Sequence, residues 1–321
     1  MVLFGQAGVV PAWSQGGGNL AGQQAGAFPC QQPGWFPETF GLKDHTVFYY
    51  DGTYYLASIY LADDDYENRF AYASSPDLCN WTDLGGILGN RPPGGWDEFR
   101  IWAPFVYEEG GTYYMFYTGV TSAFAQSIML ATSDNPADPA SWVRRGLILQ
   151  PDHPGSIWGG FDTWSDCRDP MVLKAGDRYY LYYTGLDTGG GIVGLATASD
   201  PLGPWTDWGA VLTRPVSMPE SPAVVAYGGL YYLLYNDAPP GGLGEVYHYG
   251  PTPAGPWSKA RPFRPGWAHE VWLGGDARFY TSYLTDYTVS IDYLTWDSTY
   301  VPARPFIGET VYRVSLPLVS R

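Results

Sequence analysis

Three carboxylates and a histidine stand at or beside equivalent places in a phrase that recurs along the chain. Asp44, Asp169 and His269 each open a strand-like segment, and Glu220 stands one residue before the matching place. Paired carboxylates suit cleavage of a glycosidic bond, because one protonates the leaving oxygen while the other activates water or attacks the anomeric carbon. A third carboxylate nearby can raise the pKa of the acid and orient it.

A structural interpretation of these acids also exists. An Asp at the start of a strand often only caps local backbone N–H groups. Three acids brought to one place are harder to explain in that way, because packing like charges together costs stability unless a function or a cation requires them. We therefore expect an active site.

The repeated phrase is a strand, a turn and an aromatic second strand. In its third copy, Arg168–Leu173 leads through Gly176 and Asp177 into Tyr179–Gly185, and Gly and Asp tolerate hairpin geometry. A strand of small residues, a turn and a Trp follow in most copies. The period is about 50 to 65 residues, and the aromatic pairs start at Tyr54, Tyr113, Tyr179, Tyr231 and Phe279. Aligned on these pairs, the first slot holds Asp44, Ala103, Asp169, Ser221 and His269.

Five repeats of about four short strands predict an all-β, five-bladed β-propeller. We expect residues 1–35, rich in Gly and Gln, to be an arm or surface loop, and residues 36–321 to form one catalytic domain. The alternating segment 310–316 is expected to pair in the last blade or to lie along its outer edge. A β-sandwich is the structural alternative, but it does not explain the recurrence.

Composition narrows the choice of partners. The 321 residues carry a net charge of −15, with 17% aromatic and 15% charged residues. An acidic surface repels phosphate backbones, so we expect no nucleic-acid partner, and no apolar run has the length of a membrane helix. Abundant Tyr and Trp suit a sugar ligand and a β-rich core equally. We expect a monomer that acts on an oligo- or polysaccharide.

The three cysteines, Cys30, Cys79 and Cys167, leave at least one thiol without a partner in the chain, and the sequence leaves their pairing open. Cys167 lies two residues before Asp169, and we interpret it as a packing residue. The first residues are not a secretory signal. We nevertheless expect a secreted or periplasmic protein that was processed.

The sequence resembles the five-bladed glycoside hydrolases of family 43, which share their architecture with families 32, 68 and 117. The resemblance runs from about residue 36 almost to the end. It is carried by Lys43-Asp44 with Thr46–Gly52, by Trp102-Ala103-Pro104, by Asp169-Pro170, by Glu220-Ser221-Pro222 and by His269. It implies hydrolysis of arabinofuranoside, xyloside or related linkages with inversion. Asp44 would be the general base, Glu220 the general acid and Asp169 the pKa modulator.

Three departures from the family pattern leave alternatives open. His45 replaces a proline, Phe105 stands where an acid is common, and Arg168-Asp169-Pro170 is closer to the fructan-cleaving families 32 and 68. In a retaining fructan hydrolase Asp44 would be the nucleophile, although the Asn-Asp-Pro-Asn motif is absent. The separation of the carboxyl groups distinguishes the two, at about 6.5–9.5 Å for inversion and about 5–5.5 Å for retention. A glycan-binding propeller without activity is the third alternative.

Other residues are expected to support the site. Trp102 and Phe105 would stack on a sugar or pack in the core, and Arg168 would hold a substrate hydroxyl or pair with an acid. His269 would bind substrate, water or a cation. No cofactor is required, although a structural calcium on the propeller axis near His269 would suit converging acids. Trp158 and Trp164 are expected near the rim of the pocket.

Overall fold

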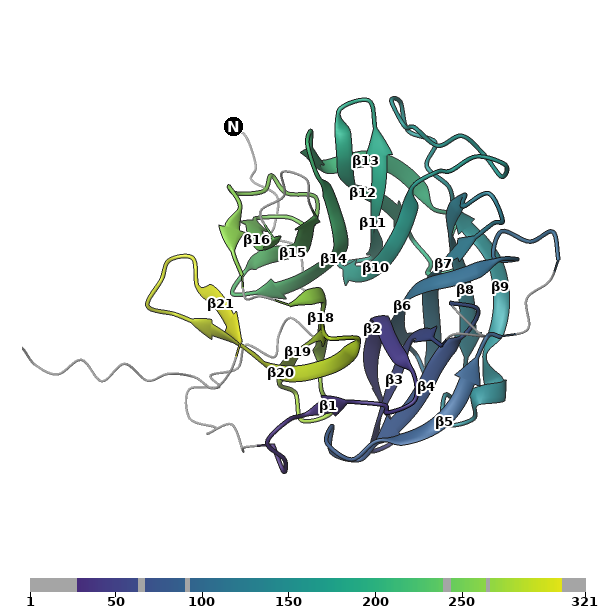
Figure 1. Cartoon of the computed structure of the whole chain (residues 1–321). Helices are drawn as coiled ribbons and strands as arrows, with labels where there is room; N and C mark the ends of the chain where they lie inside the picture. Colours follow the sequence, from purple (N-terminus) through teal and green to yellow (C-terminus); the bar gives the residue numbers. More distant parts are fainter. Residues whose placement is uncertain (1–27, 63–66, 90–92, 239–243, 264–265, 308–321) are drawn as a thin grey trace, which may run out of the picture.

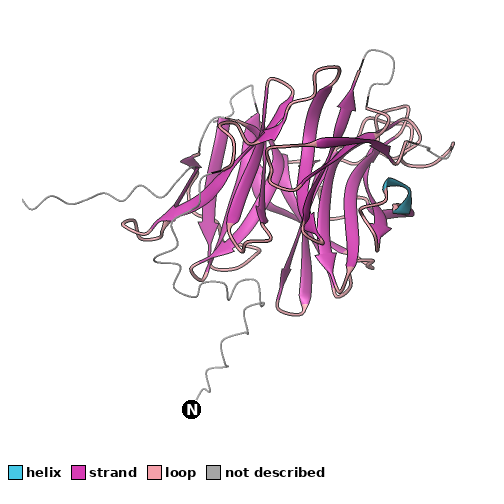
Figure 2. Ribbon diagram, turned by 90° about the horizontal axis from the view of Figure 1, so that it is seen from below, coloured by secondary structure: helices cyan, strands magenta, loops and turns pink. Residues whose placement is uncertain are grey.

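A computed structural model of the chain describes residues 28–62, 67–89, 93–238, 244–263 and 266–307. Within these residues the chain is built almost entirely of antiparallel strands. The strands form five sheets arranged around a central axis (Figure 1). The side view shows that the strands cross the thickness of the disc, with loops at both faces (Figure 2). The predicted five-bladed β-propeller is therefore confirmed.

The first four blades each contain four strands in sequence order, from the axis outward (Figure 1). The first two consist of β2 (Gly41–Tyr50), β3 (Thr53–Leu61), β4 (Phe70–Ser75) and β5 (Thr82–Ile87), then β6 (Arg100–Glu109), β7 (Thr112–Val120), β8 (Gln126–Ser133) and β9 (Val143–Leu149). A short 3-10 helix, η2 (Pro139–Ser141), precedes β9 and is capped by the Asp138 side chain.

The third and fourth blades repeat this arrangement. They consist of β10 (Cys167–Ala175), β11 (Arg178–Asp187), β12 (Gly190–Ala198) and β13 (Thr206–Arg214), then β14 (Met218–Tyr227), β15 (Leu230–Ala238), β16 (Gly244–Gly250) and β17 (Arg261–Pro262). The expected hairpin of the third blade is present, because Ala175 pairs with Arg178 across a two-residue turn. Gly176 adopts the positive φ of 66° that such a turn favours.

The fifth blade is completed by the N-terminal part of the chain. Its strands β18 (Trp267–Leu273), β19 (Phe279–Thr285) and β20 (Thr288–Asp297) are joined by β1 (Gly34–Trp35) and β21 (Arg304–Ile307), which both pair with β20. The expected N-terminal loop thus contains a short strand. A disulfide between Cys30 and Cys79 ties this segment to the first blade, while Cys167 is a buried free thiol. The predicted closing segment 310–316 lies outside the described residues.

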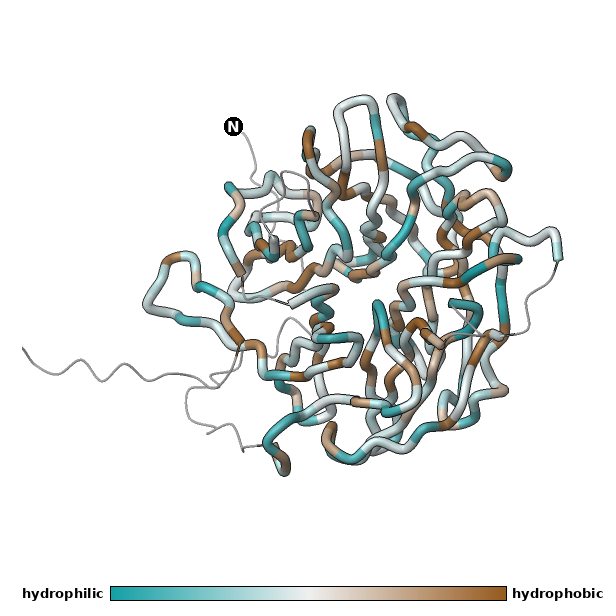
Figure 3. The backbone as a smooth tube through the Cα atoms, viewed as in Figure 1, coloured by the Kyte–Doolittle hydropathy of each residue, from teal (hydrophilic) through white to brown (hydrophobic). Residues whose placement is uncertain are grey.

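Aromatic side chains fill the space between the blades. Hydrophobic stretches recur along the strands of the disc (Figure 3). The largest fully buried side chains include seven tyrosines, among them Tyr117, Tyr182 and Tyr232. Some buried hydroxyls still find partners; Tyr182 donates to the Pro253 carbonyl at 2.7 Å. The aromatic second strand of each repeat is therefore a packing element.

Each inner strand has a register shift near its start, which indicates a β-bulge. The residue at the bulge has a positive φ in every blade, although none is glycine. These residues are Asp44 (27°), Ala103 (43°), Asp169 (56°), Ser221 (51°) and Ala268 (51°). A non-glycine residue in this region costs on the order of 1–3 kcal/mol and is found most often at functional sites. We call these five positions the bulge ring.

The bulge ring changes which side chains face the axis. In a regular strand successive side chains point to opposite faces. Here each bulge residue and the residue before it both line the cavities at one mouth of the channel, as Lys43 and Asp44 do. Because a bulge re-aims side chains, each blade supplies two neighbouring groups to the same space.

Candidate active site

A cavity of about 270 Å³ opens at the mouth of the axis where the inner strands start. It brings together Asp44, Asp169 and Glu220 from the first, third and fourth blades, with Arg168 and Trp102 beside them. Its wall is completed by Lys43, Gln126, Trp164, Ser221 and Trp267. The three acids expected at one mouth of the channel thus share one cavity.

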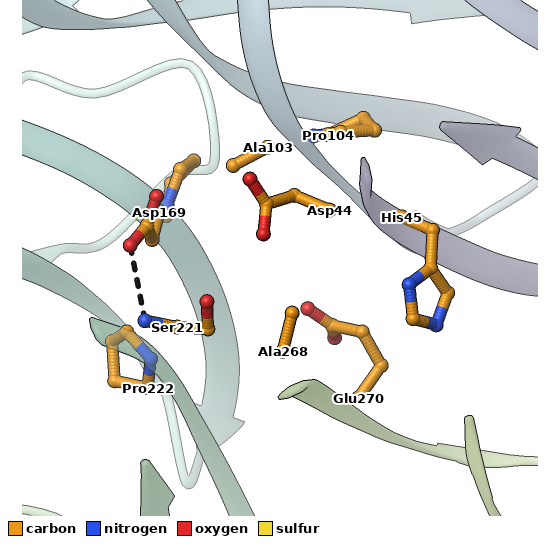
Figure 4. A pocket seen from close by; sticks show the side chains of 10 residues that line it. Asp44, His45, Ala103, Pro104, Asp169, Ser221, Pro222, Ala268 and Glu270 are labelled. Atoms are coloured by element: carbon orange, nitrogen blue, oxygen red, sulfur yellow. Dashed lines mark hydrogen bonds between the residues drawn. The ribbon is translucent and has the colours of Figure 1, made fainter. Parts of the chain in front are cut away.

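A second, much smaller cavity lies on the axis beside the first and shares Asp44, Asp169 and Ser221 with it. Its volume of about 10 Å³ is close to that of one water probe. Figure 4 shows the carboxyl groups of Asp44 and Glu270 directed toward this space. Glu270 is therefore a fourth acid of the site, and it lies outside the slot that the repeated phrase singles out.

Asp169 is held by groups from neighbouring strands. Its Oδ2 accepts hydrogen bonds from the Ser221 backbone N–H at 3.0 Å (Figure 4) and from Thr184 Oγ1 at 3.2 Å. Its own N–H donates to Thr118 Oγ1 at 3.1 Å. Since these partners lie on three different blades, the Asp169 carboxylate has a fixed position, as a group that orients other groups requires.

Arg168 lies at the centre of the charged network. Its Nη2 contacts Glu220 Oε1 at 2.8 Å, its Nη1 contacts Asp166 and Gln126, and its Nε lies 3.8 Å from Asp169 Oδ2. Burial alone lowers the pKa of Arg168, but the charges of Asp169, Glu220 and Asp166 outweigh this and raise it above its ordinary value. Of the two expected roles for Arg168, the structure shows pairing with acids.

Two acids of the site have a raised pKa. Burial, and then the negative charge of Asp169, raise the pKa of Asp44 to about 7, while Lys43 opposes the shift. Burial, followed by the charges of Asp44 and Asp169, raises the pKa of Glu270 well above its ordinary range. Asp44 therefore changes its charge near neutral pH.

The raised pKa of Asp44 predicts a stability change. A folded-state pKa of about 7 against 3.8 for the unfolded chain means that ionising Asp44 opposes folding, and stability falls as the pH rises through this window. Asp44→Asn should therefore raise the free energy of unfolding at pH 8, by an amount on the order of a few kcal/mol. Urea unfolding at pH 8 and pH 4 is the measurement. A gain of the same size at both pH values would contradict the assignment.

One rim of the cavity is anchored by Glu67, whose side chain is buried. Glu67 Oε2 accepts hydrogen bonds from Arg100 Nη1 at 2.7 Å and from Trp102 Nε1 at 2.8 Å. Lys43 Nζ lies 3.4 Å from the other oxygen and 5.7 Å from the centre of the Trp102 ring. Glu67 thereby positions two residues of the cavity wall, and nothing in the repeated phrase pointed to it.

Glu67→Gln should destabilise the fold by about 1.5–3 kcal/mol, because it weakens charge-assisted hydrogen bonds to a buried carboxylate. The half-exposed Lys43 adds little to this figure. The exposed Glu38 offers a matched control, and Glu38→Gln should leave the urea midpoint unchanged. Equal midpoints for the two variants would show that Glu67 does not anchor the rim.

His269 and Phe105 do not line either cavity. Phe105 is buried in the hydrophobic cluster that contains Met171 and Tyr182, so of its two expected roles the structure shows packing in the core. The bulge residue of the fifth blade is Ala268, and the alignment of His269 with the first slot is wrong by one residue. His269 is the counterpart of His45, and both imidazoles are buried.

The two rim tryptophans differ in placement. Trp164 lines the cavity, is 59% exposed and stacks on Phe124. Trp158 packs against the core, and its Nε1 donates to the Gln126 carbonyl at 2.8 Å. The sequence motifs did not indicate that Trp267, Gln126 and Glu270 line the two cavities. The residue after the bulge is proline in three blades and histidine in the other two, and this signal would have placed Ala268 and Trp267 correctly.

The described residues do not favour the calcium ion expected near His269. Around this imidazole lie the Thr281 hydroxyl and the rings of Phe263 and Tyr283. Calcium prefers six to eight oxygen ligands. In the described part of the chain no group of three or more His, Cys, Asp or Glu side chains is arranged to hold a metal ion. We assign no step to a cation.

The architecture and the site define a class: a five-bladed β-propeller with an acidic cavity at one mouth of its axis. The family model described as "Glycosyl hydrolases family 43" matches residues 39–165, which include the first two blades. The match covers less than half of the chain, and it shows that the first two blades are similar to this family.

Named relatives are similar to part of the chain. The chain is 34% identical over 118 residues to the "Probable arabinan endo-1,5-alpha-L-arabinosidase A" of Aspergillus flavus, which covers 36% of this chain and 33% of that protein. It is 27% identical over 142 residues to the "Arabinoxylan arabinofuranohydrolase" of Bacillus subtilis. This alignment covers 41% of this chain and 25% of that protein. The chain thus matches only about a third or less of the length of these relatives.

Solved structures share the fold over a longer range. The Cellvibrio cellulosa α-L-arabinanase superposes with a TM-score of 0.62 at 18% identity, covering 83% of this chain and 95% of that one. The sucrose-6-phosphate hydrolase from Lactobacillus gasseri gives a TM-score of 0.63 at 18% identity, and the superposition covers 79% of this chain and 59% of that one. At such identities the similarity shows the propeller fold and nothing about substrate.

Proposed function

We propose that this protein is a glycoside hydrolase that cleaves arabinofuranoside, xyloside or related linkages by an inverting mechanism. The observation that carries the proposal is the convergence of Asp44, Asp169 and Glu220 in one cavity that opens on the propeller axis. The matched family and the arabinan-related names of the relatives support it. Among these linkages we favour arabinofuranosides.

In the proposed reaction Glu220 gives its proton to the glycosidic oxygen as the bond to the anomeric carbon breaks. Asp44 accepts a proton from a water molecule, and the resulting hydroxide oxygen attacks the anomeric carbon from the opposite face. One proton enters the leaving group and one is taken from water, so the two carboxyl groups exchange protonation states. A pKa of about 7 suits a base that works near neutral pH.

Asp169 and Arg168 position the reacting groups in this scheme. Burial, and then the charge of Asp169, raise the pKa of Asp44, and Arg168 contacts Glu220 at 2.8 Å. The aromatic wall of Trp102, Trp164 and Trp267 offers apolar surface to the sugar. These contacts support a modulating role for Asp169 and a supporting role for Arg168.

The test is to incubate the protein with linear arabinan and with nitrophenyl arabinofuranoside, xyloside and galactofuranoside, and with a fructan. Proton NMR then identifies the anomer released first. Cleavage of a pentoside with inverted configuration is the expected result. Release with retained configuration, or cleavage of the fructan alone, would replace our proposal with the retaining mechanism in which Asp44 is the nucleophile. Binding without cleavage would favour a glycan-binding propeller.

We also propose that the protein is exported and acts as a monomer. A polymeric glycan is met outside the cytoplasm, and the Cys30–Cys79 disulfide fits an oxidising compartment. In the described part of the chain no helix is long and apolar enough to cross a membrane. Light scattering of the purified protein tests the monomer, and fractionation of the native host tests the export.

A further inference from the structure

Gln126 is a buried polar residue of the cavity wall that the proposed reaction does not use. It begins β8 in the second blade, and its side chain is fully buried in the wall of the cavity. Its backbone is held on both sides, because its N–H donates to the Ser165 carbonyl at 3.0 Å and its carbonyl accepts from Trp158. The position of Gln126 is therefore fixed by main-chain contacts.

The orientation of the Gln126 amide follows from its neighbour. Arg168 Nη1 donates to Gln126 Oε1 at 3.2 Å. Turning the amide over would set the amide NH₂ against a guanidinium, which has only donors. The oxygen must therefore face Arg168, and Nε2 must present its two N–H donors elsewhere. Among the described residues Gln126 Nε2 has no hydrogen-bond partner.

A buried donor without a partner costs about 1–3 kcal/mol, and such groups call for an explanation. The other terminal nitrogen of Arg168, Nη2, donates to Glu220, so Gln126 and the proposed general acid are linked through one rigid group. A ligand in the cavity would bring oxygen acceptors to this wall. Sugar hydroxyls are acceptors of the required kind.

We infer that Gln126 is a specificity-determining residue whose Nε2 donates a hydrogen bond to one hydroxyl oxygen of the sugar bound beside Arg168. The inference rests on the proposed function, because it takes the ligand to be a glycoside. A substrate that lacks this hydroxyl leaves the donor unpaired, and sites of this design reject such analogues strongly.

The test compares wild type and Gln126→Leu on nitrophenyl arabinofuranoside and on its 2-, 3- and 5-deoxy analogues. Gln126→Leu should lower kcat/KM on the parent substrate about tenfold, which corresponds to about 1.4 kcal/mol. On the one analogue that lacks the accepting hydroxyl, the two proteins should differ less than about twofold. The same loss on all four substrates, or no loss on any, would overturn the inference.

Two further variants guard against a folding defect. Gln126→Glu keeps the acceptor for Arg168 and removes the donor, and it should show the same dependence on the deoxy analogues. Gln150 is a matched control, because its Nε2 already donates to Ser127 Oγ at 3.1 Å and it does not line the cavity. Gln150→Leu should retain kcat/KM within about twofold.

The two hypotheses fail in different ways. If wild type cleaves pentosides and Gln126→Leu behaves like wild type, only the role of Gln126 is wrong. If wild type cleaves none of them, the proposed function is wrong, and calorimetry with arabinose and its deoxy forms repeats the comparison at the level of binding. Absence of binding would then overturn the inference as well.

Discussion

Glu220→Gln should lower kcat on an arabino-oligosaccharide by about 10²–10⁴-fold, the usual contribution of a positioned acid. The amide keeps the shape of the side chain and can still face Arg168, but it has no proton to give to the leaving oxygen. A dinitrophenyl arabinofuranoside should lose far less activity, because its leaving group departs without protonation. The ratio of the two losses is the measurement.

The control is Glu108→Gln, at the far end of the inner strand β6, where the side chain is exposed and accepts from the Gly111 N–H. This variant should behave like wild type on both substrates. An equal loss of both activities in Glu220→Gln would show that Glu220 does not act as the acid. It would leave Glu220 a role in binding or in holding Arg168.

Asp44→Asn should lower kcat by a similar factor of about 10²–10⁴, but by the same factor on both substrates. The reason is that water must be activated whatever the leaving group is. The matched control is Asp51→Asn in the turn that follows β2 on the same hairpin, because asparagine tolerates the positive φ of 44° found there. Full activity in Asp44→Asn would exclude Asp44 as base and as nucleophile.

The pH profile gives an independent measure of the same residue. Burial, and then Asp169, raise the pKa of Asp44 to about 7, and only the ionised form can accept a proton. The kcat/KM of wild type should therefore fall about tenfold for each pH unit below that value. The residual activity of Asp44→Asn should lack this acidic limb. A limb that persists unchanged in the variant would belong to another group.

The propeller and its acids could be predicted because they depend on repetition. A phrase that recurs five times can bury its surfaces only if the copies pack against one another, so the fold followed from the period. Asp44, Asp169 and Glu220 followed because equivalent strands begin at the same mouth of the channel. The aromatic pairs marked the second strands, which have no special geometry and therefore align without error.

The error at His269 has a specific physical cause. In every blade the bulge lies at the same distance from the inner-strand residue that pairs with the first aromatic, but the hairpin turn of the fifth blade is one residue longer, because Leu273 pairs with Phe279 where Tyr49 pairs with Tyr54. Counting back from the aromatic pair therefore misses the bulge of the fifth blade by one residue. A non-glycine residue with positive φ carries no mark in its own side-chain type, as Ala103 and Ala268 illustrate. The shift of one position assigned the bulge to His269, whose imidazole is buried, in place of Ala268. For the same reason the sequence did not indicate Trp267, the residue before the bulge, as part of the site.

Other site residues could not be predicted because they come from outside the repeated phrase. Gln126 begins the third strand of its blade, and Glu67 precedes β4. Their places depend on side-chain hydrogen bonds such as that of Arg168 to Gln126, which no periodicity records. Phe105 was ambiguous for a related reason, since an aromatic residue beside a cavity and one beneath it have the same sequence environment.

The pairing of β1 with β20 and the disulfide from Cys30 to Cys79 together join residues 30–35 to both the first and the last blade. During synthesis the disulfide to the first blade can form early. The pairing of β1 with β20 can form only after the last repeat has been synthesised. Until then the acids of the first, third and fourth blades have no enforced spacing. The proposed hydrolase activity would thus arise late in biogenesis, after most of the β-structure has formed.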